Sequence, residues 1–140
     1  MYKELLLPLD LTDKHGPAVQ TAAEFARQTG GTVTLLHVVE LIQGLPREED
    51  RAFYDRLEAA AKAHLARIGK SLTARKIAWQ SVIVFGHRLE ETVRFAAEHK
   101  CDLIIVTSPQ FDPAKPTLGL GSMSFKISVL AAAPVLMVKA

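Results

Sequence analysis

The chain has 140 residues, of which 49% are hydrophobic and 23% charged, a balance typical of one soluble globular domain over residues 1–140. The formal net charge is only +2 and basic residues are interspersed with acidic ones, so no nucleic-acid partner is predicted. No apolar run is long enough for a signal peptide or a membrane span, and the single cysteine, Cys101, excludes an internal disulfide. We therefore expect a cytoplasmic protein without a membrane anchor.

The first third of the chain predicts a strand, a helix and a second strand. The apolar run at residues 5–9 is continuous, as in a strand buried on both faces, and the turn-forming residues 10–13 end it. Gly16-Pro17 suits the first turn of a helix, and Gly30-Gly31 ends that helix. Residues 33–39 predict a second buried strand.

The middle of the chain continues this alternation. After a loop over residues 40–47, apolar residues recur every three or four positions from 53 to 72 and predict a long helix. Residues 77–85 mix β-branched and polar residues, as an edge strand does. Residues 89–97 predict a third helix, and residues 103–106 a fourth strand.

The last part of the chain holds a long connection, a helix and a strand. Residues 107–120 include three prolines and predict no element of their own, and a loop of that length indicates function. A final helix is predicted after Gly121-Ser122. Pro134 precedes the apolar run 135–138, which favours an edge strand with one open side.

Five parallel strands and four helices predict an α/β fold, a three-layer, doubly wound, Rossmann-like sheet, because right-handed crossovers place helices on both faces. Small molecules bind such sheets beyond the carboxyl ends of the strands, near the point where the strand order reverses. Asp10, Val38-Val39 and Thr107-Ser108 lie at those ends. The sequence therefore predicts a small-molecule site there.

Segments spread over nearly the whole chain match one known pattern. They are Leu7-Pro8-Leu9-Asp10, Leu36-His37-Val38-Val39, Asp102-Leu103-Ile104-Ile105-Val106, Gly121-Ser122-Met123-Ser124-Phe125-Lys126-Ile127 and Ala133-Pro134-Val135-Leu136-Met137-Val138. In combination and in order they resemble the universal stress protein family. The resemblance implies the strand order 3-2-1-4-5 and a homodimer formed through the last strand, Val135–Val138.

The resemblance also implies a nucleotide site. In nucleotide-binding members, the aspartate that ends the first strand contacts the ribose, and backbone at the end of the second strand meets the adenine. These roles fall on Asp10 and Val38. The residues implied to hold the cofactor, ATP or AMP, are Asp10, Val38, Thr107, Ser108, Gly121, Ser122 and Met123.

The family's phosphate motif is degenerate in this chain. It consists of a glycine, two residues, a second glycine, nine residues, and Gly-Ser or Gly-Thr, and only Gly121-Ser122 matches its end. Thr107-Ser108 and then Pro109-Gln110-Phe111 stand where the first two glycines belong. Glycine lets the backbone approach a phosphate and proline removes an N–H donor, so the amides that open the last helix are the remaining anion donors, with Lys115 and Lys126 as added charge.

Each of these features also has a simpler structural interpretation. Asp10 is a good turn former at the end of a strand, and Ser122 or Ser124 can cap the last helix without any ligand. The five histidines lack metal-binding spacing, so no metal site is predicted and structural or surface roles are favoured. Cys101 is interpreted as a small buried residue rather than a redox centre.

Two functions remain open at this stage. The first is a homodimeric stress-response regulator that binds an adenine nucleotide and whose long loop becomes ordered to signal that the nucleotide is bound. The alternative is a dimeric interaction module that binds no nucleotide and whose 108–120 loop contacts partners. The sequence contains no Walker A loop, nucleophile elbow or GxGxxG fingerprint, so we expect no enzyme activity beyond weak ATP hydrolysis.

Overall fold

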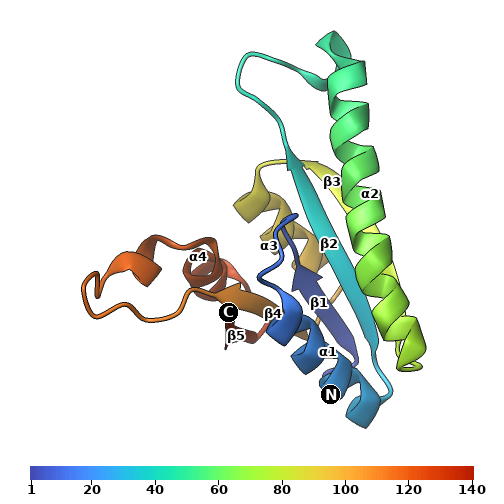
Figure 1. Cartoon of the computed structure of the whole chain (residues 1–140), viewed down its shortest axis with the longest axis vertical. Coiled ribbons are helices and arrows are strands. Elements are labelled where there is room, and N and C mark those ends of the chain that lie inside the picture. The colour runs from blue at the N-terminus through green and yellow to red at the C-terminus, as the bar shows by residue number, and fades with distance from the viewer.

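The computed structural model describes residues 1–140 as five strands that alternate with four α-helices (Figure 1). The strands are β1 (Glu4–Pro8), β2 (Thr32–Glu40), β3 (Ala78–Gly86), β4 (Leu103–Ser108) and β5 (Val135–Lys139). The helices are α1 (Gly16–Thr29), α2 (Arg51–Ala74), α3 (Arg88–Glu98) and α4 (Met123–Leu130), with 3-10 turns η1 (Arg47–Glu49) and η2 (Leu118–Gly121). All strands pair in parallel in the order β3-β2-β1-β4-β5, which confirms the predicted fold and strand order.

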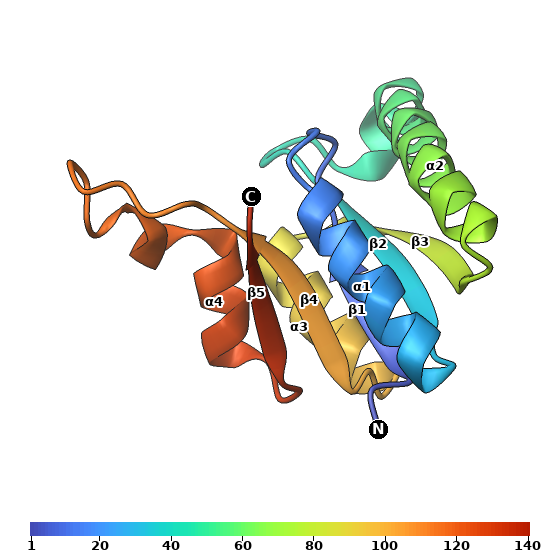
Figure 2. The same cartoon turned by 60° about the horizontal axis from the view of Figure 1, so that its bottom comes forward.

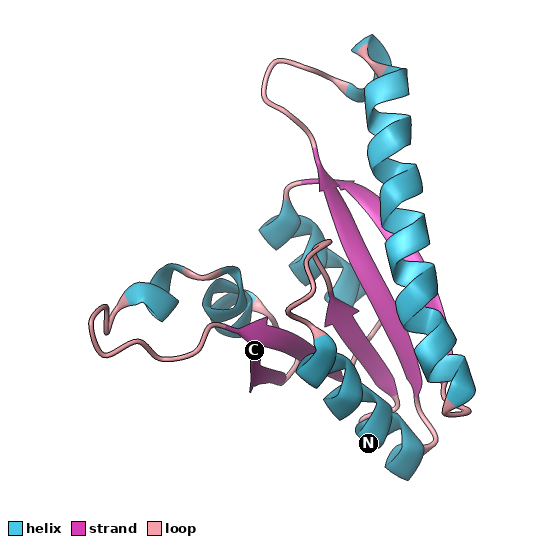
Figure 3. Cartoon of the chain, in the orientation of Figure 1, coloured by secondary structure: helices cyan, strands magenta, loops and turns pink.

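Helices cover both faces of the sheet, as Figures 2 and 3 show. On one face, α1 and α2 pack against Leu5 and Leu7 of β1, and on the other, α3 and α4 pack against Leu6. All three leucines are at most 1% exposed. Successive side chains of a strand point to opposite faces, so a strand covered on both sides requires this continuous apolar run.

The ends of several elements differ from the predicted ones by a few residues. The largest difference that affects the site is at β4, which continues through Thr107 and Ser108 and pairs there with Val138 and Lys139 of β5. The predicted loop therefore begins at Pro109, and η2 occupies its last residues. The edge positions predicted for β3 and β5 are confirmed.

Two helices begin beside the carboxyl ends of the central strands. The turn after β1 leads into α1 at Gly16, and the next residue, Pro17, lies in the first turn of the helix. α4 begins after Ser122, whose hydroxyl accepts a hydrogen bond from the amide of Phe125 at 3.2 Å. None of the helices combines the length and the apolar composition that crossing a bilayer would require.

Candidate functional site

A pocket opens at the carboxyl ends of β1, β2 and β4, between the first turns of α3 and α4. This is the point where the strand order reverses, because β1 connects to β2 on one side and pairs with β4 on the other. Its apolar lining consists of Pro8, Leu9, Leu36, Val38, Val106, Met123 and Ile127, and its polar lining of Asp10, Lys14, His15, Arg88, Thr92, Thr107 and Ser124. The arrangement combines an apolar slot with converging polar groups, as small-molecule sites do.

Asp10, His15 and Thr107 form a hydrogen-bonded group in this pocket. His15 Nε2 lies 2.7 Å from Asp10 Oδ1, and His15 Nδ1 lies 2.7 Å from Thr107 Oγ1. Because a carboxylate only accepts hydrogen bonds, Nε2 carries the proton and Nδ1 accepts from the threonine hydroxyl. The buried imidazole therefore links the end of β1 to the end of β4.

The Asp10 carboxylate is fixed by further donors from the turn after β1. The amide and the hydroxyl of Thr12 both donate to Oδ1, and Lys14 Nζ lies 3.2 Å from Oδ2. Burial alone would raise the pKa of Asp10, but the hydrogen bonds from Thr12, His15 and Lys14 outweigh it and hold that pKa well below its ordinary value. Oδ2 meets only Lys14 and is the oxygen that remains open to a ligand.

His15 makes the stability of the fold depend on pH near neutrality. Burial lowers the pKa of His15, and the neighbouring Asp10 only partly offsets this. The unfolded chain therefore takes up a proton at this histidine before the folded one does, so the contribution of His15 to stability is lost as pH falls below about 6.5. We expect His15→Gln to flatten the pH dependence of the urea-unfolding free energy between about pH 7 and pH 5. His87→Gln, at an exposed histidine, is the control and should leave the slope unchanged.

Thr92 lies at the pocket wall with an unsatisfied hydroxyl. The residue belongs to α3 and is 1% exposed, and its Oγ1 has no hydrogen-bond partner. A buried hydroxyl without a partner is unfavourable, and native proteins retain few of them. This hydroxyl is therefore a candidate for a contact with a bound molecule.

Thr92→Val is expected to stabilise the free protein by about 1 kcal/mol, because valine keeps the shape and removes the unpaired hydroxyl. In a chain of this size that gain corresponds to a rise of roughly 2–4 °C in Tm, measurable by thermal denaturation. Thr34→Val is the matched control, since buried Thr34 Oγ1 accepts a hydrogen bond from Gln80 and should not stabilise when replaced. A lower Tm for Thr92→Val would contradict the conclusion that the Thr92 hydroxyl has no hydrogen-bond partner in the free protein.

The first turn of α4 supplies backbone donors to the pocket. Met123 and Ser124 line it, and their amides make no hydrogen bond within the chain, as is usual at a helix start. The helix dipole adds a partial positive charge at the same place. The backbone amide of Met123, one of the predicted site residues, is thus available to an anion.

Four of the seven predicted site residues meet in this pocket, namely Asp10, Val38, Thr107 and Met123. Ser108, the residue after Thr107 on β4, does not line the pocket. It is 3% exposed, and its hydroxyl accepts a hydrogen bond from Lys139 Nζ at 3.2 Å. Gly121 and Ser122 do not line it either. The Ser122 hydroxyl donates to Gly119 O at 2.7 Å and caps α4, which is the simpler interpretation considered for it.

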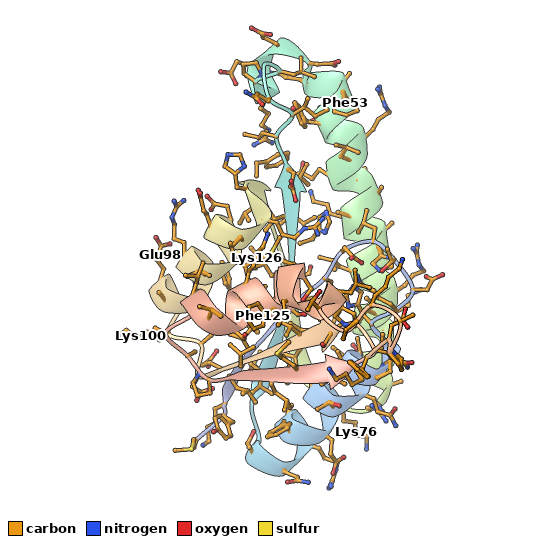
Figure 4. The ribbon with its side chains drawn as sticks, turned by 90° about the vertical axis from the view of Figure 1, so that its left-hand side faces the viewer. Phe53, Lys76, Glu98, Lys100, Phe125 and Lys126 are labelled. Atoms are coloured by element: carbon orange, nitrogen blue, oxygen red, sulfur yellow. The ribbon has the colours of Figure 1, made fainter.

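The two lysines predicted to add charge lie outside the pocket. Lys126 is exposed on α4, where Figure 4 labels it beside Phe125. Lys115 lines a separate hollow beneath the 109–120 loop. Lys14 and Arg88 are the cationic side chains that do line the pocket, and the sequence analysis singled out neither.

His15 and Thr92 were also missed as pocket residues. His15 was treated with the other histidines as structural, and it is indeed fully bonded, but it is bonded to two site residues. Its position directly before the Gly-Pro start of α1 was the available signal. Nothing in the sequence distinguishes Thr92 from an ordinary helical threonine.

The pocket is narrow in this structure. Its volume is about 70 Å³, whereas sites for drug-sized molecules are typically about 300–1,000 Å³. Arg88 and Lys14 are the longest side chains of the lining, and Arg88 Nε lies 3.3 Å from Glu40 Oε1 at the end of β2. Movement of these two side chains is the simplest way to enlarge the pocket.

Comparison with known proteins gives one consistent family. A model described as the universal stress protein family matches residues 1–139. The universal stress protein MJ0577 of Methanocaldococcus jannaschii is 28% identical over 156 residues, covering 99% of this chain and 96% of the relative. A solved structure of MJ0577 superposes with a TM-score of 0.80 at 25% identity and covers 100% of this chain and 98% of its own.

Two further solved structures share the fold and hold nucleotides. A universal stress protein from Archaeoglobus fulgidus in complex with dAMP has a TM-score of 0.73 at 18% identity, with 97% of each chain covered. A universal stress protein in complex with cAMP has a TM-score of 0.72 at 17% identity and covers 99% of this chain and 97% of its own.

Proposed function

The chain belongs to the universal stress protein family, and from this premise we propose that it is a stress-response regulator that binds an adenine nucleotide in the pocket at the ends of β1, β2 and β4. The observation that carries the proposal is the fixed Asp10 carboxylate beside an apolar slot at the point where the strand order reverses. Fold relatives that hold dAMP and cAMP support the choice of adenine nucleotides.

The lining suits the three parts of a nucleotide. Once Arg88 and Lys14 move aside, the base lies between Val38 on β2 and Met123 on α4, where apolar side chains cover its faces. Asp10 Oδ2 accepts a ribose hydroxyl, and the free amides of Met123 and Ser124 receive a phosphate. The Thr92 hydroxyl is within the lining to bond a polar edge of the base.

The degenerate loop favours a monophosphate over a triphosphate. Pro109 carries no N–H, and the loop that follows it lines a separate hollow and contributes no residue to the pocket. Two free helix amides and two cationic side chains are enough for one phosphate group. We therefore propose AMP as the preferred ligand and ATP as the weaker one.

The nucleotide proposal is tested by titrating AMP, ATP and GMP against the Tm of the purified protein, with calorimetry for the affinities. A ligand at a hundred times its Kd stabilises the folded state by about 2.7 kcal/mol, several degrees in a chain of this size. We expect AMP to raise Tm most, ATP less, and GMP least. No shift with either adenine nucleotide at millimolar concentration would reject the proposal.

A dimeric interaction module is the second candidate, because apolar side chains are exposed at one end of the molecule. Phe111 is 70% exposed and Leu118 and Leu120 are each 58% exposed, all in the loop between β4 and α4. β5 is an open edge strand next to it, suited to pairing with a second copy through Val135–Val138. Sedimentation equilibrium over a concentration series tests the homodimer, and a monomer at about 100 μM would reject it.

We propose regulation rather than catalysis. His15 is bonded to Asp10 through Nε2 and to Thr107 through Nδ1, and we propose that this arrangement holds the ends of β1 and β4 together rather than activating a nucleophile. An ATPase assay on the purified protein tests the absence of catalysis, and saturable turnover that is lost in a pocket variant would contradict it.

We also propose a cytoplasmic location. The one cysteine is a buried free thiol, and burial raises the pKa of Cys101 to about 11, as suits a reducing compartment.

A further inference from the structure

A second, larger groove lies on the face of the sheet that carries α1 and α2. Figures 1 and 2 show these two helices side by side on that face. The groove has a volume of about 520 Å³ and runs from the turn before α1 along α2. Nine of its eleven lining residues are polar or glycine, so it does not resemble an uncovered piece of core.

The groove carries cationic side chains without carboxylate partners. Arg67 lines it from α2 and Arg75 from the position directly after that helix, and neither forms an ion pair with an acidic residue. Asp13 is the only acidic side chain in the lining, and Glu24 nearby is held by Arg27 at 2.6 Å. The groove therefore has an excess of positive charge.

His64 adds an unsatisfied donor to the same groove. Its Nδ1 lies 3.3 Å from an Arg67 guanidinium nitrogen, and because a guanidinium only donates, Nδ1 accepts and the proton sits on Nε2. Nε2 is shielded from solvent and has no acceptor within the chain. A buried N–H without an acceptor is costly, and a small rotation of the ring toward an anion in the groove would satisfy it.

The opposite wall includes the start of α1. Gly16, at the start of α1, lines the groove, and α1 has neither a capping side chain nor an acidic residue in its first turn. The dipole of α1 therefore adds a partial positive charge to this wall, where Asp13 of the preceding turn is the only acidic lining residue. Arg67 and His64 of α2 face this wall across the groove.

We propose that the groove between α1 and α2 is a second binding site, for a small metabolite that bears a phosphate group, recognised by Arg67, Arg75 and His64. A phosphate group accepts from the Arg67 guanidinium and the His64 imidazole N–H together, which lie next to each other on α2. Arg75, eight residues further along the chain, lines the far end of the groove and adds positive charge for the rest of the metabolite. The site is separate from the nucleotide pocket, and the two share His15 as a common wall.

Inorganic phosphate is the probe for this site. Sodium phosphate is titrated into ¹⁵N-labelled protein at constant ionic strength, and the amide resonances of Gly16, Val19 and Ser71 are followed. We expect saturable shifts of these amides in the wild-type protein. In Arg67→Gln/Arg75→Gln the apparent Kd should rise by about tenfold or more. Arg56→Gln, at an exposed arginine of α2 outside the groove, should titrate as the wild type does.

Three outcomes would overturn the second site. One is the absence of saturable shifts up to about 50 mM phosphate, where a site of millimolar Kd would be filled. Another is an identical titration in the double variant. The third is a set of shifts confined to Met123 and Ser124, which would place phosphate in the nucleotide pocket instead. AMP titrated separately reports on that pocket, so failure of either site is recognised independently of the other.

Discussion

Gly69→Ala is expected to destabilise the fold by about 1–3 kcal/mol, although alanine is the better helix former. Gly69 lies on α2 directly over the Trp79 ring of β3, and a Cβ at this position would come within 2.2 Å of two ring carbons. The ring cannot move away freely, because Trp79 Nε1 donates a hydrogen bond to Thr73 Oγ1 at 2.8 Å. Urea denaturation measures the loss of unfolding free energy. Overpacking against Trp79 predicts such a loss, whereas helix propensity alone predicts a gain.

A double variant identifies the cause of that loss. Trp79→Leu removes the ring, so adding Gly69→Ala to it should cost little or even stabilise through the helix propensity of alanine. The coupling energy of the cycle then measures the steric contact alone. A stabilising effect of Gly69→Ala in the wild-type background would mean that the ring does not rest on this glycine.

The fold followed from the sequence because each element carries its own local signal. The run Leu5-Leu6-Leu7 indicated a strand buried on both faces, and both faces are indeed covered. Gly30 ended α1, and it adopts the left-handed conformation with a φ of 74°. The end of β4 was missed, since Thr107 and Ser108 are held in the strand by pairing with Val138 and Lys139, a contact that local sequence cannot reveal.

The candidate site was only partly predictable, for a similar reason. Asp10 and Val38 end neighbouring strands, so the topology alone brings them together. Thr107 and Ser108 are adjacent in sequence but point to opposite faces of β4, so only one of them reaches the pocket. The unpaired hydroxyl of Thr92 depends on the packing of α3 against the sheet, which periodicity does not resolve.

Asp10→Ala is expected to weaken AMP binding by about 10- to 100-fold and to destabilise the free protein. The loss of affinity is that of one charge-assisted hydrogen bond to a ribose hydroxyl. The loss of stability arises because the buried Nε2–H of His15 loses its acceptor and the turn loses its bonds from Thr12. We expect a cost of about 1–3 kcal/mol for these unpaired groups. Calorimetry with AMP and urea denaturation measure the two effects.

Asp10→Asn separates the two effects, since its amide oxygen still accepts from Thr12 and His15 while the charge is lost. This variant should keep most of the stability at neutral pH but bind AMP more weakly than the wild type. Because the folded pKa of Asp10 is depressed, the stability that its charge contributes is present above about pH 4 and is lost as pH falls further. Asp13→Ala, an exposed neighbour in the same turn, is the control and should bind AMP normally. Unchanged AMP affinity in both Asp10 variants would remove this residue from the nucleotide site and leave it a structural role in the turn after β1.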